Sequence, residues 1–505
     1  MILRLRTALA AVCVIVVAGC QTPVPQALLP GDLPKSFTGP VAPGAGVWPK
    51  ADWWKSFNST EMSGLIATAQ TNNLDLAVAM ASVLQAEAQR NVARSALFPD
   101  LNAQASAQRT STGGGSFGFA GQSLSSSSKS IVGNTFSVGL NASYMPDIWG
   151  LAQDNLRAAQ EALKSASFAQ EVVALTVTAE VANTYLDVLA LRQQVAITEK
   201  NIEDAKRILT ITQAKVTNGV SSNLDLAQQK AIIDGQEAQL PPLREQEREA
   251  VYALAILLAQ PPEGFDVSAQ NMDGLASPAI APGIPSALLE RRPDVAEAEA
   301  NLASAHANVD AARAAFFPQI SLTGSGDTSA FKIGQLFQAS TMGWSIGASA
   351  LQTIFDAGKL KAESDVARAE QQGLVSTYRK TVLTAFSNVE TSVGQVSNFG
   401  QEQEALEREV KDSAEAFRLS ELQYREGIIE LLNLLQAQQT LFTAENQLIL
   451  AKLARLQADV NLYMALGGGW SEKPDDKTQT ETSPNPPPPP KPEEHQWCVL
   501  SALCF

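Results

Sequence analysis

Histidine is scarce in this 505-residue chain, which contains only His306 and His495. Histidine titrates nearest neutral pH and is a frequent zinc ligand, so its scarcity argues against acid–base catalysis and against a zinc site. His306 lies in an alanine-rich segment without a second histidine, a cysteine or a close set of acidic residues. We therefore expect no catalytic residue, no metal, no cofactor and no enzyme activity.

Cysteine and basic charge are also limited. Of four cysteines, Cys13 lies in the N-terminal leader, and Cys498 and Cys504 lie in the last eight residues, so no disulfide framework supports the body of the chain. The net charge is −15, from 37 Lys and Arg against 52 Asp and Glu, and the basic runs are pairs such as Arg291-Arg292. The chain has no large cluster of Lys and Arg residues that could bind phosphate groups, so nucleic acid is not an expected partner.

The first nineteen residues are predicted to be a signal peptide. Two arginines precede an apolar stretch, Ala8 to Val17, that is too short to span a bilayer. The stretch ends in Val17-Ala18-Gly19-Cys20, which resembles the lipobox of bacterial lipoproteins. This resemblance implies cleavage before Cys20 and a diacylglycerol on its thiol. Gln21 follows in place of the Asp that favours inner-membrane retention in that class, so we expect contact with outer-membrane lipid.

The rest of the chain is duplicated. The segment from Arg94 to Leu101 recurs from Arg313 to Ile320, with Phe-Pro at the same place in both copies. A second pair, Lys215 to Gly219 and Gln423 to Gly427, is followed by Leu-Asp-Leu in one copy and Leu-Asn-Leu in the other. Because repeats fix an architecture, we expect two copies of one unit that differ in the lengths of their loops.

Each repeat is expected to contain one very long helix. No glycine or proline occurs between Leu151 and Asn218, and apolar residues recur there at helical spacing. The segment from Lys359 to Glu426 matches it, with three glycines but no proline. At 1.5 Å per residue such a helix is about 100 Å long, which requires a bundle or coiled coil. Shorter helices, able to stack end to end beside the long ones, are expected at 61–97, 224–258 with an interruption at Pro241-Pro242, 286–316 and 428–466.

Between the helices the period of polarity drops to two. Apolar and small polar residues alternate from Thr135 to Tyr144 and from Thr341 to Ala350, the length and pattern of transmembrane strands. A half-buried sheet in a soluble domain has the same pattern, but the leader and lipobox favour membrane strands. The remaining segments are weaker strands at 101–107 and 320–322, and loops rich in Gly, Ser and Thr at 110–130 and 324–340.

Four strands per chain cannot close a barrel. An open sheet edge in hydrocarbon leaves amide groups unpaired, so the chain is expected to oligomerise. Two copies would give an eight-stranded barrel filled by its own side chains, whereas three would give twelve strands. The expected fold class is therefore mainly α with a membrane β-barrel: long antiparallel helical hairpins forming a periplasmic α-barrel, and four transmembrane β-strands per chain completing a twelve-stranded barrel in a trimer.

Motifs over most of the chain carry a family resemblance. They are Trp53-Trp54, the two Phe-Pro strand entries, Leu289 to Val295 with Ala298-Glu299 after it, Ile354 to Gly358, and the ending Leu466 to Trp470. The region from about Trp53 to Trp470 resembles the TolC-like outer-membrane efflux factors, most closely their NodT lipoprotein branch. Arg-Arg-Pro-Asp with the downstream Ala-Glu is the most specific motif, although Pro293 and Asp294 also suit the first turn of any helix.

The resemblance implies a function. It predicts a homotrimer in the cell outer membrane, lipid-anchored and extending into the periplasm, that acts as a passive exit duct for drugs or other toxic small molecules. A periplasmic adaptor protein would join it to an inner-membrane efflux transporter. Two alternatives remain at this point: a lipid-anchored periplasmic coiled-coil protein without a pore, and the exit duct of a protein-secretion system.

The resemblance also implies where the duct is constricted. In the family the second hairpin lines the constriction, and it usually carries Asp where this chain has Gln436, often with another Asp at the position of Asn433. We therefore expect closure by a ring of Leu432 and neutral amides. Tyr424 and Glu430 are expected beside this ring.

The turns at Gly219 and Gly427 are expected to form the periplasmic tip, because each links a long helix to a shorter return helix. Together with Asp225 they are the predicted adaptor contacts. The expected organisation is a signal peptide at 1–19, a lipidated extension at 20–60, a first repeat at 61–260, a linker at 261–283, a second repeat at 284–470, and a Pro-rich tail at 471–505 that departs from the family.

Overall fold

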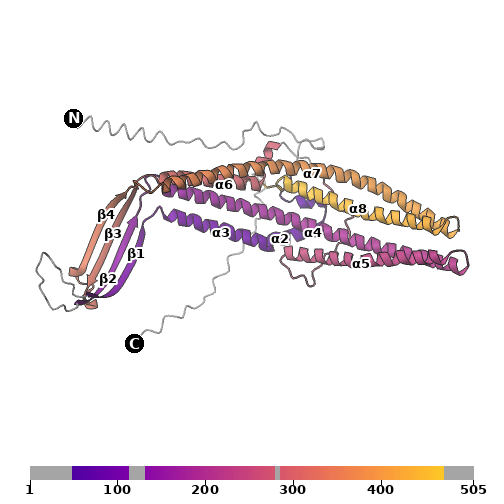
Figure 1. Cartoon of the computed structure of the whole chain (residues 1–505), viewed down its shortest axis with the longest axis horizontal. Helices are drawn as coiled ribbons and strands as arrows, with labels where there is room; N and C mark the ends of the chain where they lie inside the picture. Colours follow the sequence, from indigo (N-terminus) through magenta and orange to yellow (C-terminus); the bar gives the residue numbers. More distant parts are fainter. Residues whose placement is uncertain (1–47, 113–130, 279–284, 471–505) are drawn as a thin grey trace. The chain divides into compact units, whose positions relative to one another are not determined.

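The structure is a computed structural model in which residues 48–112, 131–278 and 285–470 are described (Figure 1). Cys20, the lipobox and the Pro-rich tail lie outside the described residues. Within the described part the two repeats have matching elements, because each contains a helix of 22 residues, two strands, a helix of 67 residues and a helix of 35 residues. The predicted duplication of elements is confirmed.

The bounds of these elements follow the chain order. The first repeat contains α3 (Leu74–Ser95), β1 (Asp100–Thr112), β2 (Ile131–Tyr144), α4 (Leu151–Thr217) and α5 (Asn223–Leu257). The second contains α6 (Pro293–Ala314), β3 (Gln319–Ala330), β4 (Met342–Leu351), α7 (Lys359–Arg425) and α8 (Leu431–Ala465). The shorter elements are η2 (Trp53–Phe57), α2 (Thr60–Asn72), η3 (Pro285–Glu290), η4 (Ile333–Gln335) and η5 (Ala339–Thr341).

Two of the predicted shorter helices differ from the structure: one is divided into two helices, and the other begins later. The run predicted at 61–97 is divided, because Asn73 leaves helical geometry and its side chain accepts hydrogen bonds from the amides of Asp75 and Leu76 at 2.8 and 3.1 Å. The helix predicted from 286 begins at Pro293. Proline disfavours helical geometry in the residue before it, and Arg292 is accordingly extended.

The predicted interruption at Pro241-Pro242 is wrong, since α5 is continuous from Asn223 to Leu257. Both prolines are exposed. A proline lacks an amide donor and its ring crowds the carbonyl of the preceding turn, but on an exposed helix face that carbonyl can tilt outward and bond water instead. Packing of α5 along α4 then keeps the helix intact.

The four strands form one antiparallel sheet in the order β1-β2-β3-β4. The loop predicted from 324 is wrong, because β3 continues to Ala330 and Gly324 pairs with Ala142 on one side and Ile346 on the other. Because glycine has no side chain, the alternation of polar and apolar residues that marks a strand is missing here, and the strand could not be recognised from the sequence. Residues 110–112, which were predicted as loop, likewise belong to a strand, since β1 runs to Thr112.

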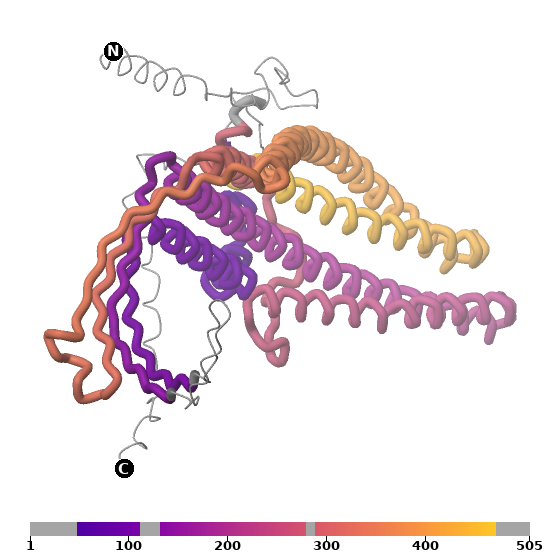
Figure 2. Tube along the Cα trace, turned by 60° about the vertical axis from the view of Figure 1, so that its left-hand side comes forward, coloured from indigo at the N-terminus to yellow at the C-terminus, as the bar shows by residue number. Residues whose placement is uncertain are grey.

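The helices form a layer in a simple order. The long α4 packs against α3 and α5 on one side and against α6 and α8 on the other, and α7 packs against α6 and α8 (Figures 1 and 2). The shorter helices thus stack in pairs beside the long ones, as the sequence predicted. One stretch of α4 is apolar enough to cross a membrane, but half of it is buried inside the fold. Its contacts with five helices, α2, α3, α5, α6 and α8, account for that hydrophobicity.

A lateral layer covers one side of the helices. It consists of η2, residues 258–278 and η3, and its apolar side chains join the cores built on α4, α7 and α8. Trp53 stacks on Tyr463 with ring centroids 4.8 Å apart. Buried Arg192 donates to Glu247 and to the carbonyl of Val267, at 2.9 and 2.6 Å. These contacts fix the lateral layer to the middle of the helices.

Candidate functional site

The tips of the two helical hairpins contact each other through hydrogen bonds. Gly219 and Gly427 turn the chain with φ of 75° and 76°, a backbone geometry that favours glycine. The Lys215 ammonium donates to the Tyr424 carbonyl and lies 4.5 Å from the centroid of its ring, while the Thr212 and Tyr424 hydroxyls are 3.0 Å apart. Sequence reasoning singled out Tyr424 but missed Lys215 and Thr212, whose partners are more than 200 residues away.

The residues predicted for the constriction divide into two groups. Leu432, Asn433 and Gln436 are exposed and share one face of α8, because residues three and four apart are neighbours on a helix. Leu432 is 64% exposed although Leu434, two residues later, is fully buried. Tyr424 is buried in the joint between the hairpins and is not part of that exposed face. Glu430 is the N-cap residue of α8, without a side-chain cap.

Asp225 begins the first return helix. It forms a capping box with Ser222: the Ser222 hydroxyl accepts from the Asp225 amide at 3.2 Å, and the Asp225 carboxylate accepts from the Ser222 amide at 3.0 Å. The Ser221 hydroxyl also donates to this carboxylate at 2.6 Å. The hydrogen bonds from Ser221 and Ser222 lower the pKa of Asp225, so it is ionised at neutral pH.

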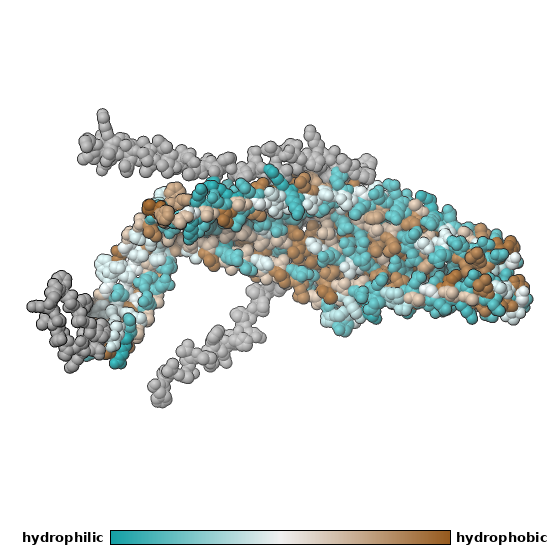
Figure 3. All heavy atoms as spheres, in the orientation of Figure 1, coloured by the Kyte–Doolittle hydropathy of each residue, from teal (hydrophilic) through white to brown (hydrophobic). Residues whose placement is uncertain are grey.

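A groove with a volume of about 580 Å³ separates the hairpin tips. Its lining includes Lys215, Asp225, Glu430 and Leu432, so positive, negative and apolar side chains all reach it. Exposed apolar residues border the groove on both hairpins, and they appear as brown patches at the tips in Figure 3. These residues are Val220, Leu224, Ile428 and Leu432. The tips therefore present a mixed surface suited to contact with another protein.

The sheet has one polar and one apolar face, and the hydrogen-bond register decides which residues share them. On the polar face the hydroxyls of Ser106 and Ser137 form a hydrogen bond of 2.8 Å, and those of Ser325 and Ser345 form one of 2.9 Å. On the opposite face Trp344 and Ile346 are 80% and 81% exposed. Exposed aromatic and aliphatic side chains on one strand face, with hydroxyls on the other, are the pattern of a wall between lipid and water.

The Arg-Arg-Pro-Asp motif joins two stacked helices. Buried Arg292 donates to the Asp294 carboxylate at 2.9 and 2.7 Å and to the Ala465 carbonyl at 2.9 Å. Pro293 opens α6, as predicted for a first helical turn. Gly467 is required beside this junction, because a Cβ there would lie 1.9 Å from the Arg291 carbonyl. The motif therefore connects the N-terminus of α6 to the C-terminus of α8.

Metal binding has no candidate in the part of the chain that the structure describes, since no group of three His, Cys, Asp or Glu residues converges there. His306 contacts the Gln371 amide at 3.0 Å and lies 3.9 Å from Asp310, a packing arrangement between α6 and α7. The described residues thus offer a sheet with one polar and one apolar face, and two hairpins that contact each other at their tips.

Comparisons with known proteins agree with this architecture. The family model for outer membrane efflux proteins matches residues 65–260 and 284–468. The chain is 39% identical to the pyoverdine export outer membrane protein OpmQ of Pseudomonas aeruginosa, over 83% of this chain and 87% of that protein. It is 31% identical to the toluene efflux pump outer membrane protein TtgC of Pseudomonas putida, over 88% and 93%.

A solved structure gives the same result. The open state of the Neisseria gonorrhoeae MtrE outer membrane channel superposes with a TM-score of 0.77 at 28% identity, covering 89% of this chain and 97% of that one. The fold is thus that of an outer membrane efflux channel, which is consistent with a role without catalysis. This chain belongs to the outer membrane efflux protein family.

Proposed function

We propose that three copies of this chain form the outer-membrane exit duct of a tripartite efflux pump. The observation that carries the proposal is the four-stranded sheet, in which β1 and β4 each pair with a strand on one side only. Unpaired strand edges are not tolerated in hydrocarbon, so each edge requires a strand from another chain. Three copies supply twelve strands around a water-filled bore, whereas two would supply only eight.

The helices support the same arrangement. None of the residues of α3 is buried, and Leu74, Val78, Leu84 and Val92 lie on its face opposite α4, each at least 60% exposed. The α3 and α5 edge of one chain and the α7 edge of the next would meet in a ring. Burial of this apolar face would stabilise the trimer by about 25 cal/mol for each Å² covered.

The pump would be completed by two partners. A periplasmic adaptor protein would bind the hairpin tips at Gly219, Asp225 and Gly427, where the mixed groove offers charged and apolar contacts. The adaptor would connect the duct to an inner-membrane transporter, which supplies the energy. The duct itself would be passive.

Closure of the duct would occur at the same tips. In a trimer the exposed face of α8 that bears Leu432, Asn433 and Gln436 would line the bore, giving a leucine ring and two rings of neutral amides. The bond from Lys215 to the Tyr424 carbonyl would hold the inner hairpin against the outer one in the closed state. Opening would then require these hairpin contacts to separate.

The anchor and the cargo complete the proposal. Cys20 would carry the lipid that tethers the N-terminus to the outer membrane, while barrel closure fixes the embedding. Relatives at 39% and 36% identity are named for pyoverdine export, and relatives at 31% for toluene or antibiotic efflux. This order of similarity favours pyoverdine or a similar compound as the exported molecule.

The test is a comparison of the mature chain with its Cys20→Ser variant in outer membranes. We expect both to run as compact, heat-modifiable oligomers, because the strands and not the lipid fix the embedding, and only the parent to incorporate labelled acyl chains. A Cys20→Ser protein that was soluble and monomeric would contradict the membrane-strand proposal. The cargo is tested in a strain that lacks this chain. We expect that strain to lose pyoverdine export and to keep its toluene tolerance.

A further inference from the structure

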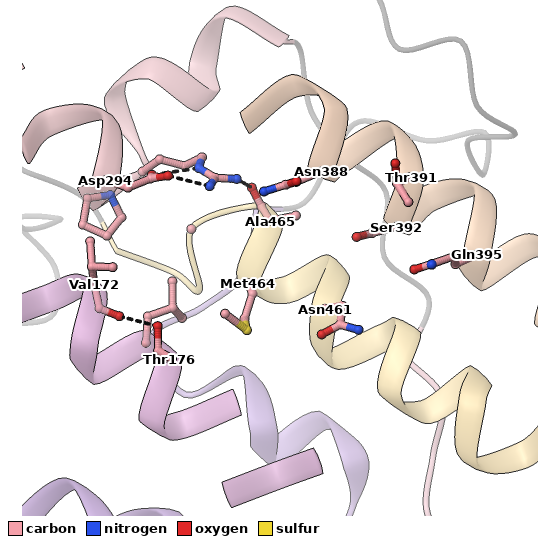
Figure 4. A pocket seen from close by; sticks show the side chains of 14 residues that line it. Val172, Thr176, Asp294, Asn388, Thr391, Ser392, Gln395, Asn461, Met464 and Ala465 are labelled. Carbon is pink, nitrogen blue, oxygen red and sulfur yellow. Dashed lines mark hydrogen bonds and ion pairs between the residues drawn. The ribbon is translucent and has the colours of Figure 1, made fainter. Parts of the chain in front are cut away.

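A cavity of about 350 Å³ lies where α6 and α8 meet end to end between α4 and α7 (Figure 4). This volume is near the lower limit of the range of about 300–1,000 Å³ that small-molecule sites occupy. Val172, Leu175 and Met464 give it an apolar wall, and the charged pair Arg292–Asp294 closes one end. The pair neutralises itself, so the cavity has no unbalanced charge.

Besides Thr176, whose hydroxyl donates to the Val172 carbonyl at 2.9 Å, five neutral polar side chains line the rest of the cavity: Asn388, Thr391, Ser392, Gln395 and Asn461. Among the described residues none of these five side chains forms a hydrogen bond. Figure 4 shows Ser392 and Gln395 pointing from α7 toward α8. Asn388, Thr391 and Asn461 are exposed to solvent, whereas Ser392 is buried. Amides and hydroxyls that bond water and not protein offer both donors and acceptors to a ligand that replaces the water.

The position of these residues around α7 indicates which side of the helix layer the cavity faces. Val382, Val389 and Val393 belong to the core under the lateral layer. Thr391 and Gln395 follow Val389 by two and six residues, which places them about 200° and 240° around the helix at 3.6 residues per turn. They therefore lie on the side away from the lateral layer. In a closed ring of helices the bulky lateral layer must lie outside, so this cavity opens toward the bore.

We propose that this cavity is a subsite in the wall of the duct for neutral, hydrogen-bonding small molecules, such as compounds rich in amide or hydroxyl groups. The inference rests on the proposed exit-duct function and names the chemistry of the cargo that the wall recognises. Binding is weak, as a transport path requires, because a few exchanged hydrogen bonds contribute little net affinity. A charged group is disfavoured, since Arg292 and Asp294 are already paired and no other charge reaches the cavity.

Saturation-transfer NMR on the full mature protein in a sugar-free detergent tests the proposal. The probe is N-acetyl-triglycine amide, and its anionic counterpart, N-acetyl-triglycine, differs only in the terminal carboxylate. We expect the neutral probe to bind at least tenfold more tightly than the anion. The double variant Asn388→Leu, Asn461→Leu removes two amides and should weaken binding of the neutral probe about tenfold.

The matched control is Asn398→Leu, which removes an exposed amide of α7 outside the cavity lining and should leave binding unchanged. Heat-modifiable migration and single-channel conductance report whether each variant still folds and conducts. Absence of neutral-probe binding, equal binding of the anion, or equal losses in the double variant and the control would each overturn the inference. A parent protein that binds the probe but forms no channel would instead overturn the proposed function, because the binding measurement requires no channel.

Discussion

The two repeats have equal elements but unequal surroundings. The 22-residue α3 has no buried residue, whereas its counterpart α6 has eight; the 35-residue α5 has six, whereas α8 has sixteen. The cause is topological, because α6 and α8 each pack against both long helices, whereas α3 and α5 pack mainly against one of them, α4. Identical lengths and periodicity therefore do not determine burial. The under-buried first repeat forms an edge of the chain, and in our account a neighbouring chain covers it.

The largest expected effect comes from charging this edge. Leu84→Asp places a carboxylate on the face of α3 opposite α4, where Leu84 is 60% exposed. We expect a monomer whose helices fold but which forms no trimer, because burying an unpaired charge at an interface costs several kcal/mol. Light scattering after size exclusion in detergent measures the oligomer. Ser82→Asp, exposed two turns from Asp75 on a flank that already carries charge, is the control, and a trimeric Leu84→Asp protein would contradict the account.

The next effect compares equivalent leucines of the two return helices. Leu434 is fully buried in the core beneath the second hairpin, and its counterpart Leu226 is half-buried. Leu434→Ala should lower the free energy of unfolding by about 2–5 kcal/mol, because it leaves a cavity. Leu226→Ala should cost less than half as much. Denaturation followed by helical circular dichroism measures both, and equal losses would show that the two repeats are packed alike.

How far the sequence predicts this fold depends on the local signal of each element. The long helices are predictable because no proline occurs in either, and β2 and β4 because their polarity alternates. The continuous α5 is not, since Pro241-Pro242 indicates a break that solvent exposure removes. The extension of β3 is not predictable either, because Gly324 and Gly326 carry no side-chain pattern and pairing on both sides fixes them.

The candidate site was predictable to a similar degree. The repeat identifies the turns at Gly219 and Gly427. The family resemblance points to Leu432 and Gln436, which share an exposed face of α8, and their role at a constriction stays a prediction. The contact of Lys215 with Tyr424 was not predictable, because it joins residues 209 apart and has no local signature. The same applies to the cavity beside Arg292, which four helices create together.

The two return helices also differ in a buried carboxylate, which makes the stability of the second repeat depend on pH. Asp459 of α8 is fully buried, and burial raises its pKa to about 6, whereas the first repeat has Val251 at this position. Below the unfolded pKa the proton is bound in both states. As the pH rises from about 4 through 6, the unfolded chain releases it first and the folded state loses up to about 3 kcal/mol.

Asp459→Asn should remove this pH dependence and stabilise the protein above pH 6. Thermal unfolding between pH 4 and pH 8 measures it, with the exposed Asp412→Asn on α7 as the control. The parent should lose more stability over this range than the Asp459→Asn variant loses. If the Asp459→Asn variant had the same pH profile as the parent, a group other than Asp459 would be the cause of the pH dependence.

The smallest expected effect is at the hairpin tips, where equivalent residues again differ in role. Leu432→Ala should raise single-channel conductance, and Gln436→Asp should create block by trivalent cations, because three carboxylates about 6 Å apart repel by roughly 3 kcal/mol per pair and attract cations. The matched substitutions Leu224→Ala and Gln228→Asp on the first hairpin should do neither. Block of the parent channel, or equal effects of both pairs, would reject the second hairpin as the constriction.

The number of chains in one channel tests the central claim most directly. Native mass spectrometry of the protein extracted from outer membranes should show three mature chains, because three copies of the four-stranded sheet give twelve strands around an open bore, whereas two give eight strands filled by their own side chains. A stable complex of two chains, or a single chain that resists heat without oligomerising, would contradict the closed twelve-stranded barrel on which the account depends.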